Sequence, residues 1–174
     1  MKIGKVYILT LDPIESKPEI IRKLRDCGLP GSTPYEIVKG FDGRYGDIPN
    51  EYKIYKHWNL GSDHWNSWWK RPILPGEIGC AIGHILIWKK IISDNINSCL
   101  ILEDDFLCSG KYSITDICEP IQSKWDISLL GRSKIDVNSI EQEIDSTWVR
   151  SNHFYNMHAY VIKTPAVAKK LLSN

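Results

Sequence analysis

The order of three predicted elements near the start of the chain constrains its fold most. Residues 6–11 form a short, largely apolar, β-prone run, which predicts a buried strand. A helical segment follows, with Ser16 and Glu19 at the spacing of a capping box and Gly28 as its expected end. Residues 35–38 are typical of a second strand. A strand, a helix and a strand in this order predict an α/β fold with a mostly parallel sheet flanked by helices.

The rest of the chain continues this alternation. Residues 75–93 predict a deeply buried helix, because apolar side chains cover most of its circumference. A last helix is expected after Thr164 and Pro165, which are typical of a helix start. Three further runs are strand candidates: residues 99–102, 125–131 and 158–162.

Length and charge narrow the class of protein. The chain has 174 residues, which fits a single domain over residues 1–174. The 22 basic and 21 acidic residues give a net charge of +1, which argues against general nucleic-acid binding. No apolar stretch reaches the roughly 20 residues that cross a bilayer, and the first residues lack the apolar core of a secretory signal. We therefore expect a cytoplasmic location and no transmembrane segment.

The five cysteines predict neither a disulfide framework nor a zinc finger, because their number is odd and no C-x-x-C pair is present. Two of them, Cys80 and Cys99, lie inside apolar runs. We interpret both as small buried hydrophobic residues.

Residues 43–74 are rich in Gly, Pro, Asn, Tyr and Trp and show no sustained period, so we interpret them as an irregular, lid-like segment. Four of the seven tryptophans lie within it: Trp58, Trp65, Trp68 and Trp69. Aromatic faces stack on sugar rings, which would suit a lid that binds an acceptor. Packing of the large rings onto the core explains the same residues, and both interpretations stay open.

Three adjacent carboxylates, Glu103, Asp104 and Asp105, follow the apolar run at residues 99–102. Ligands of open α/β sheets bind outside the carboxyl ends of the strands. Adjacent carboxylates repel one another, and a cation such as Mg²⁺ or Mn²⁺, which prefers oxygen ligands, would compensate that repulsion. A solvated acidic turn explains the same tripeptide, so the three residues alone leave the choice open.

Several ordered motifs together resemble glycosyltransferase family 25, which includes lipopolysaccharide and lipooligosaccharide sugar transferases and the collagen galactosyltransferase domains. The motifs are Val6 to Asp12, Leu74 to His84, Leu100 to Asp105, Trp125 to Gly131 and His158 to Leu172. The resemblance implies a Rossmann-like domain of the GT-A type. It also implies an inverting transferase that moves a hexose, galactose or glucose, from a UDP-sugar to a glycan or a hydroxylysine-type protein acceptor.

The resemblance implies Mn²⁺ or Mg²⁺ as the cofactor, with Asp105 and Asp104 as metal ligands and Glu103 and Asp104 at the donor. Such a cation would offset the charge that grows on the leaving nucleotide diphosphate.

The catalytic base stays open among Glu77, His84 and His158. Glu77 and His84 lie seven residues apart, about two helical turns, and so share a helix face. Structural roles explain the same residues: Glu77 suits a helix N-terminus, His84 a hydrogen-bonded core position, and His158 the start of a strand. We expect His84 to face the donor pocket.

Some features depart from the family pattern. The segment from Leu11 to Lys17 contains no Arg where the family has an Arg-rich turn, and Gly83 stands where Ser is common. The family's catalytic domains also continue beyond the segment matched by Leu171 and Leu172. The domain is therefore expected to be short at its C-terminal end. The alternative function is a catalytically silent module that binds a sugar nucleotide or a glycan.

Overall fold

The structure is a computed structural model that describes residues 2–53, 73–108, 110, 113–114, 116, 125–131, 142–144, 148–150 and 157–173. Its helices and strands are β1 (Lys5–Thr10), α1 (Lys17–Asp26), β2 (Tyr35–Lys39), α3 (Pro75–Asp94), β3 (Cys99–Glu103), β4 (Ile127–Leu129), β5 (Gln142–Glu143), β6 (Val149–Arg150), β7 (Ala159–Ile162) and α5 (Pro165–Leu172). None of the helices in these ranges has both the length and the apolar character needed to cross a bilayer.

Five strands form the main sheet in the order β2-β1-β3-β7-β4. The pairs β1–β2 and β1–β3 are parallel, whereas β7 runs antiparallel to both of its neighbours, β3 and β4. Four of the five strands therefore point the same way. This mixed but mostly parallel sheet confirms the predicted α/β fold, and each predicted strand is present within a few residues of its expected bounds. The short pair β5–β6 was not predicted.

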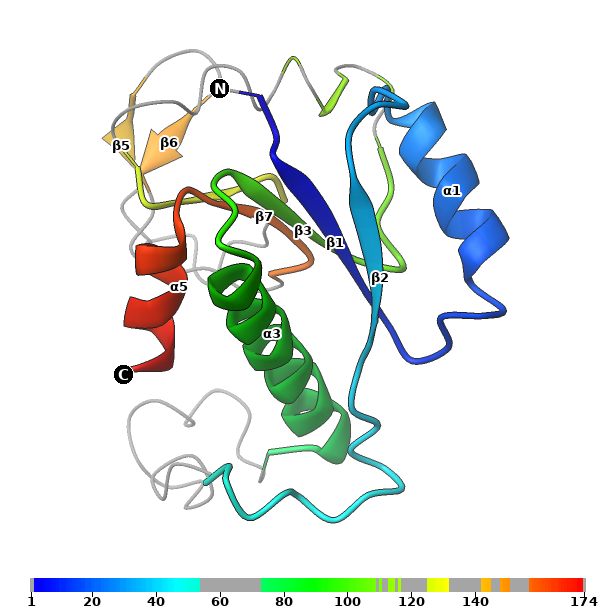
Figure 1. Cartoon of the computed structure of the whole chain (residues 1–174), viewed down its shortest axis with the longest axis vertical. Coiled ribbons are helices and arrows are strands. Elements are labelled where there is room, and N and C mark those ends of the chain that lie inside the picture. Colours follow the sequence, from blue (N-terminus) through cyan, green and yellow to red (C-terminus); the bar gives the residue numbers. More distant parts are fainter. Residues whose placement is uncertain are drawn as a thin grey trace.

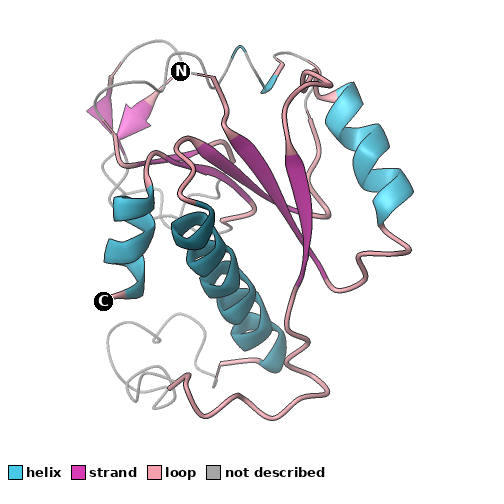
Figure 2. Cartoon of the chain, viewed as in Figure 1, coloured by secondary structure: helices cyan, strands magenta, loops and turns pink. Residues whose placement is uncertain are grey.

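Helices cover both faces of the sheet (Figures 1 and 2). On one face α1 packs its Ile20 and Leu24 against Val6 and Ile8 of β1. The alternate side chains of β1 and β3 point to the other face, where they meet α3 and α5. Because successive residues of a strand face opposite sides, continuous apolar strands such as β1 and β3 suit this three-layer arrangement.

Two local predictions for the helices are wrong. Ser16 precedes α1 as its N-cap but makes no side-chain cap, and its hydroxyl instead lies 3.1 Å from that of Thr10. Glu19 pairs with Arg22, so the predicted capping box is absent. The second wrong prediction is that α3 is buried around most of its circumference. Ala81 of α3 is exposed, because that side of the helix lines a cleft instead of packing against a neighbouring layer. Gly28 does end the turn after α1, with a φ of +72°.

Two glycines let α3 begin against the segment that follows β2. A Cβ atom on Gly79 would lie 2.5 Å from the carbonyl oxygen of Phe41, and one on Gly43 would lie 1.9 Å from the carbonyl oxygen of Pro75. No L side chain fits these contacts without a shift of the backbone. The two glycines thus fix the start of α3 beside the carboxyl end of β2.

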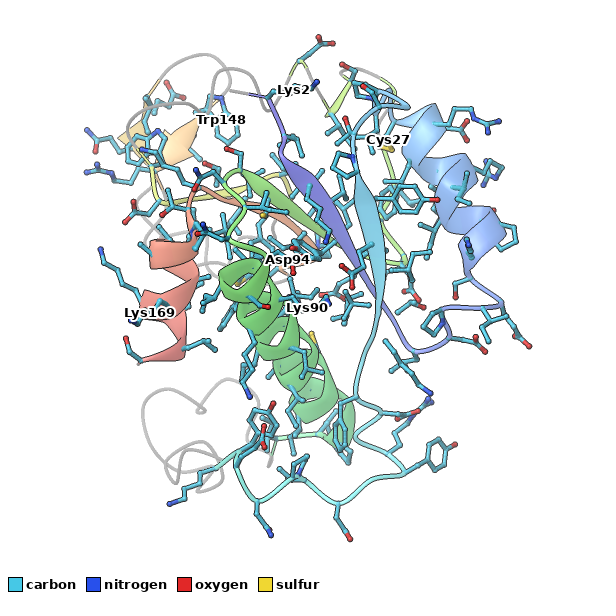
Figure 3. The ribbon with its side chains drawn as sticks, in the orientation of Figure 1. Lys2, Cys27, Lys90, Asp94, Trp148 and Lys169 are labelled. Carbon is cyan, nitrogen blue, oxygen red and sulfur yellow. A yellow bond between two sulfur atoms is a disulfide. The ribbon has the colours of Figure 1, made fainter. Side chains whose placement is uncertain are left out.

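The other end of α3 is tied to the sheet by charge. The Lys5 ammonium lies 2.7 Å from Glu36 and 2.6 Å from Asp94, and the Tyr7 hydroxyl donates to Asp94 over 2.7 Å. Burial alone would lower the pKa of Lys5, but its two carboxylate partners outweigh burial and raise that pKa. Figure 3 shows Lys90 and Asp94 on α3, and Lys90 adds a 2.7 Å contact to Glu36. This network lies at the amino end of β1.

Cys27 and Cys108 form a disulfide, with their Cα atoms 5.5 Å apart. The prediction that the cysteines form no disulfide is therefore wrong for this pair. The bond joins the end of α1, labelled at Cys27 in Figure 3, to the chain three residues after Asp105. Sequence spacing could not reveal it, because 81 positions separate the two cysteines and only the fold brings them together.

Candidate functional site

A cleft of about 1170 Å³ opens where the end of β3 meets the N-terminal half of α3. Its wall comes from four stretches: parts of residues 48–53, 73–85, 103–107 and 157–158. The carboxyl ends of β1 and β2 and the start of α3 lie at the same end of the molecule (Figure 1). The cleft therefore occupies the edge of the sheet at which α/β proteins bind ligands.

Glu103, Asp104 and Asp105 do not point to one common centre. Glu103 is the last residue of β3, and its carboxylate turns towards α3. The Asp104 carboxylate accepts a 2.5 Å hydrogen bond from the Thr10 hydroxyl at the end of β1. Asp105 is exposed and lines the cleft. The turn thus distributes its three charges over three environments, which reduces their mutual repulsion.

The backbone of this acidic turn is held from two sides. The Asp104 amide donates to the Leu9 carbonyl over 3.0 Å, which extends the pairing of β3 with β1. The Lys23 ammonium donates to the Asp104 carbonyl oxygen over 2.7 Å from α1. The disulfide at Cys108 adds a covalent link from the same helix. Asp105 is therefore presented from a turn that is fixed to both β1 and α1.

A chain of hydrogen bonds leads from Glu103 and His84 on the cleft wall into the core. The Trp88 indole N–H donates to the Tyr160 hydroxyl over 2.9 Å, and that hydroxyl lies 2.9 Å from His84 Nδ1. His84 Nε2 lies 3.2 Å from Glu103 Oε1. The hydrogen bond from His84 is the main cause that lowers the pKa of Glu103, against an opposing effect of burial.

The donors in this chain follow from its chemistry. An ionised Glu103 carboxylate only accepts, so His84 Nε2 carries the hydrogen of that bond. In a neutral imidazole Nδ1 then has no hydrogen, and the Tyr160 hydroxyl donates to it. Desolvation raises the pKa of Tyr160, consistent with a phenol that keeps its proton. His84 is 6% exposed, so it is both a hydrogen-bonded core residue and part of the cleft wall.

Cys80 lies one turn before His84 on α3 and is exposed, which corrects the prediction of a buried residue. The prediction holds for Cys99, which is fully buried. Cys80 Sγ lies 3.7 Å from Glu103 Oε1; although the residue is exposed, partial desolvation of its sulfur, followed by the negative charge of Glu103, raises the pKa of the thiol to about 12. Sequence reasoning missed Cys80 as a member of the site, although its spacing of four from His84 on a helix was a usable signal.

Glu77 and His158 also line the cleft. The Glu77 carboxylate accepts a 2.7 Å hydrogen bond from the Leu74 amide at the start of α3, which is a helix-capping contact. His158 lies directly before β7, and its ring packs against Gly131, where a Cβ atom would lie 2.5 Å from His158 Nε2. The structure thus brings all three base candidates to one cleft.

Part of the predicted lid also reaches the cleft. Residues 43–53 contain no helix or strand, as expected for that stretch, and Glu51, Tyr52 and Lys53 line the opening. The Lys89 ammonium of α3 lies 3.0 Å from Glu51 and 3.2 Å from the Tyr52 hydroxyl. The four clustered tryptophans fall in residues 54–72, outside the described part of the chain, so the lid stays a prediction.

Comparisons with known proteins agree with the motifs at this cleft. The model of glycosyltransferase family 25, described as an LPS biosynthesis protein family, matches residues 23–174. Procollagen galactosyltransferase 1 of Danio rerio is 31% identical over 109 residues, which cover 59% of this chain and 18% of the relative. Procollagen galactosyltransferase 1-A of Xenopus laevis is 26% identical over 99% of this chain and 28% of its own length.

A third relative differs in its described activity. The protein named probable inactive glycosyltransferase 25 family member 3, of Bos taurus, is 29% identical over 112 residues, which cover 60% of this chain and 18% of that protein. The chain thus spans less than a third of the length of these relatives. The family model nevertheless covers most of the chain, including every residue of the cleft described above. The chain therefore belongs to glycosyltransferase family 25.

Proposed function

We propose that this chain is a hexosyltransferase that moves galactose or glucose from a UDP-sugar to a glycan or a hydroxylysine-type protein acceptor, with inversion. The observation that carries the proposal is the cleft at the carboxyl end of β3, with Asp105 on its wall, in a member of a glycosyltransferase family. A volume of about 1170 Å³ lies slightly above the usual range of roughly 300–1,000 Å³ for ligand pockets, enough for a nucleotide sugar. The galactosyltransferase names of the relatives favour galactose.

The acidic turn fits a hard divalent cation. Asp105 offers an exposed carboxylate, and Asp104 has one oxygen beyond the one that accepts from Thr10. Mg²⁺ and Mn²⁺ typically take one or two protein carboxylates together with substrate phosphates. Asp105 would hold the ion from the cleft wall, whereas Asp104, whose carboxylate turns to Thr10, would act on it through its charge. The ion would supply charge neutralisation at the diphosphate that leaves.

The chain's own residues would hold the donor. Asp104 lies where β1 and β3 end side by side, so its charge adds to that of Asp105 at this edge of the sheet. Lys53 is exposed on the rim and brings a positive charge to an opening where the Arg-rich turn of the family is missing. The Glu103 carboxylate is already hydrogen-bonded to His84, so we assign Glu103 the role of positioning the acidic turn.

His158 is our choice for the base that accepts the proton of the attacking hydroxyl. Both ring nitrogens of His84 are hydrogen-bonded, and the Glu77 carboxylate caps α3. His158 lies on the cleft wall at moderate exposure, and imidazole is the side chain best suited to proton transfer near neutral pH.

A screen of UDP-sugars tests the proposal. UDP release and product mass are measured with the full chain, Mn²⁺ and candidate acceptors, and again with a chelator. One UDP-hexose should give metal-dependent transfer, and the anomeric configuration of the product checks inversion. Asp105→Asn should remove most of the Mn²⁺ enhancement of UDP binding in calorimetry, whereas Asp26→Asn, an exposed carboxylate on α1, should leave it unchanged.

The second candidate is a catalytically silent module that binds a sugar nucleotide or a glycan. The inactive name of the 29% identical relative favours it, because likeness to the family at this level does not separate active from inactive members. Saturable UDP-sugar binding without transfer or hydrolysis of any donor in the screen would select this candidate. Equal UDP affinity with and without Mn²⁺ would defeat the metal-assisted proposal.

A further inference from the structure

We propose that Cys80, His84 and Glu103 form a binding site for a thiophilic divalent ion, Zn²⁺ being the chemical type, separate from the hard-ion site proposed at Asp105. One ligand atom of each residue lies within 4.8 Å of the other two. Among the residues that the structure describes, this is the group of three such side chains whose donor atoms converge. It contains a thiol and an imidazole, the ligands that select Zn²⁺ over Mg²⁺ or Mn²⁺.

The distances suit a tetrahedral ion. Zn²⁺ bonds to sulfur, nitrogen and oxygen at about 2.0–2.3 Å, which places tetrahedral ligand atoms about 3.2–3.8 Å apart. His84 Nε2 and Glu103 Oε1 are 3.2 Å apart, and Cys80 Sγ and Glu103 Oε1 are 3.7 Å apart. Two of the three separations therefore match already. The third separation, between the ligand atoms of Cys80 and His84, is at most 4.8 Å, and the Cys80 side chain would have to move about 1 Å closer.

The surroundings of His84 give an independent reason. An imidazole that binds a metal through one nitrogen usually donates a hydrogen bond from the other, which fixes its orientation. His84 Nδ1 lies 2.9 Å from the Tyr160 hydroxyl, which is itself held by the Trp88 indole N–H, so Nε2 is aimed at Glu103. The Tyr160 hydroxyl can accept instead of donate, so the same contact supports the Nδ1–H form that a metal at Nε2 requires.

The charges of the three ligands and their access from the cleft also suit a bound Zn²⁺. Deprotonated Cys80 and ionised Glu103 supply two negative charges to one divalent ion, and the imidazole stays neutral. The thiol releases one proton to solvent when the ion binds, while the imidazole exchanges its Nε2 proton for one at Nδ1. All three residues line the cleft, so an ion can enter, and a fourth coordination position remains open to the cleft.

Titration of the full chain with Co²⁺, a spectroscopic substitute for Zn²⁺, tests the site. The titration is done anaerobically and without reductant, so that the Cys27–Cys108 bond stays intact. We expect one equivalent of Co²⁺ to produce a near-ultraviolet thiolate-to-cobalt absorption band that added Zn²⁺ removes. Cys80→Ser should abolish the band, and Cys99→Ser, which changes a buried cysteine of the core, should keep it.

A second variant tests whether the Glu103 carboxylate is a ligand of the ion. Glu103→Gln should weaken Co²⁺ binding at least about tenfold, since changes even outside the ligand shell cost roughly 10–100-fold. No band in the unaltered chain would show that the three side chains are only a hydrogen-bonded cluster, and the proposal would be wrong. A band of equal intensity in Cys80→Ser would also overturn it. The assay contains no sugar donor, so its outcome is independent of the proposed transferase function.

Discussion

The disulfide between Cys27 and Cys108 gives the most quantitative prediction, and Cys108→Ser is the cleanest way to remove it. Cys108 is exposed, so its replacement leaves the core intact, whereas Cys27 is 3% exposed and belongs to the α1 side of the core. A disulfide stabilises mainly by restricting the unfolded chain, and the effect grows with the length of the loop it closes. The two cysteines are 81 positions apart, so the chain-entropy relation gives about 4.5 kcal/mol at 25 °C.

This figure is an upper value, because residual structure in the unfolded chain reduces the entropy that the bond removes. For a domain of this size each kcal/mol shifts the melting temperature by roughly 2–4 °C, so the full value corresponds to a shift of about 9–18 °C. A loss of about 2–4.5 kcal/mol is therefore expected in Cys108→Ser.

Urea unfolding followed by tryptophan emission measures the difference. The unaltered chain should lose the same free energy of unfolding when a reductant is added, and Cys108→Ser should not respond to the reductant. Leu107→Ser is the matched control, because Leu107 is the neighbouring residue and is 86% exposed, so its replacement should change stability by less than about 0.5 kcal/mol. Equal stability of oxidised and reduced protein, with the disulfide confirmed by mass spectrometry, would refute the reasoning.

Three further predictions concern packing and pH. Gly79→Ala should destabilise the fold by about 1–3 kcal/mol in the same assay, because the new methyl group meets the Phe41 carbonyl, whereas Gly76→Ala, with open space around it, should be neutral or slightly stabilising. Tyr160→Phe should cost about 1–3 kcal/mol, because it leaves the Trp88 N–H and His84 Nδ1 without their shared partner; an unchanged melting temperature would contradict this. The hydrogen bond from Lys5 lowers the pKa of Asp94, so its contribution is present above the unfolded carboxylate pKa of about 3.9 and is lost as the pH falls through the lower folded value. The stability difference between the unaltered chain and Asp94→Asn, at most about 1 kcal/mol, should therefore vanish in acid, and a constant difference down to pH 2 would contradict it.

Most of the fold could be predicted because its elements are marked locally. The apolar runs of β1, β3 and β7 and the helix signals at Pro75 and Pro165 are short-range patterns, and each gave an element close to its observed bounds. The antiparallel direction of β7 and its position between β3 and β4 depend on pairing across the chain, and no local pattern encodes them. The capping prediction at Ser16 failed for a related reason, since a hydroxyl on β1 competes for that side chain.

The sequence indicated where the cleft lies but not the contacts within it, and the roles of its residues stay predictions. The acidic triplet at the end of an apolar strand located the cleft, and helical spacing placed Glu77 and His84 on its wall. That Glu103 turns to His84 while Asp104 turns to Thr10 follows from the layers above and below the strand, which spacing does not describe. The Cys27–Cys108 bond escaped prediction in the same way. The cytoplasmic location stays a prediction, and the redox state of this pair in cells would test it.

The position of β7 has a consequence for the order in which the molecule assembles. β7 is hydrogen-bonded on both sides, so before residues 159–162 are in place the edge of β3 is open and β4 has no partner in the sheet. The β1–β2 pairing joins residues only 29 positions apart and can form early, whereas β1–β3 joins residues 94 positions apart and β3–β7 joins residues 57–63 positions apart, so both pairings of β3 close long loops at a larger entropic cost. An assembly intermediate would thus expose an apolar strand edge that readily pairs with another chain. Completing both pairings of β3 is therefore what removes this open edge.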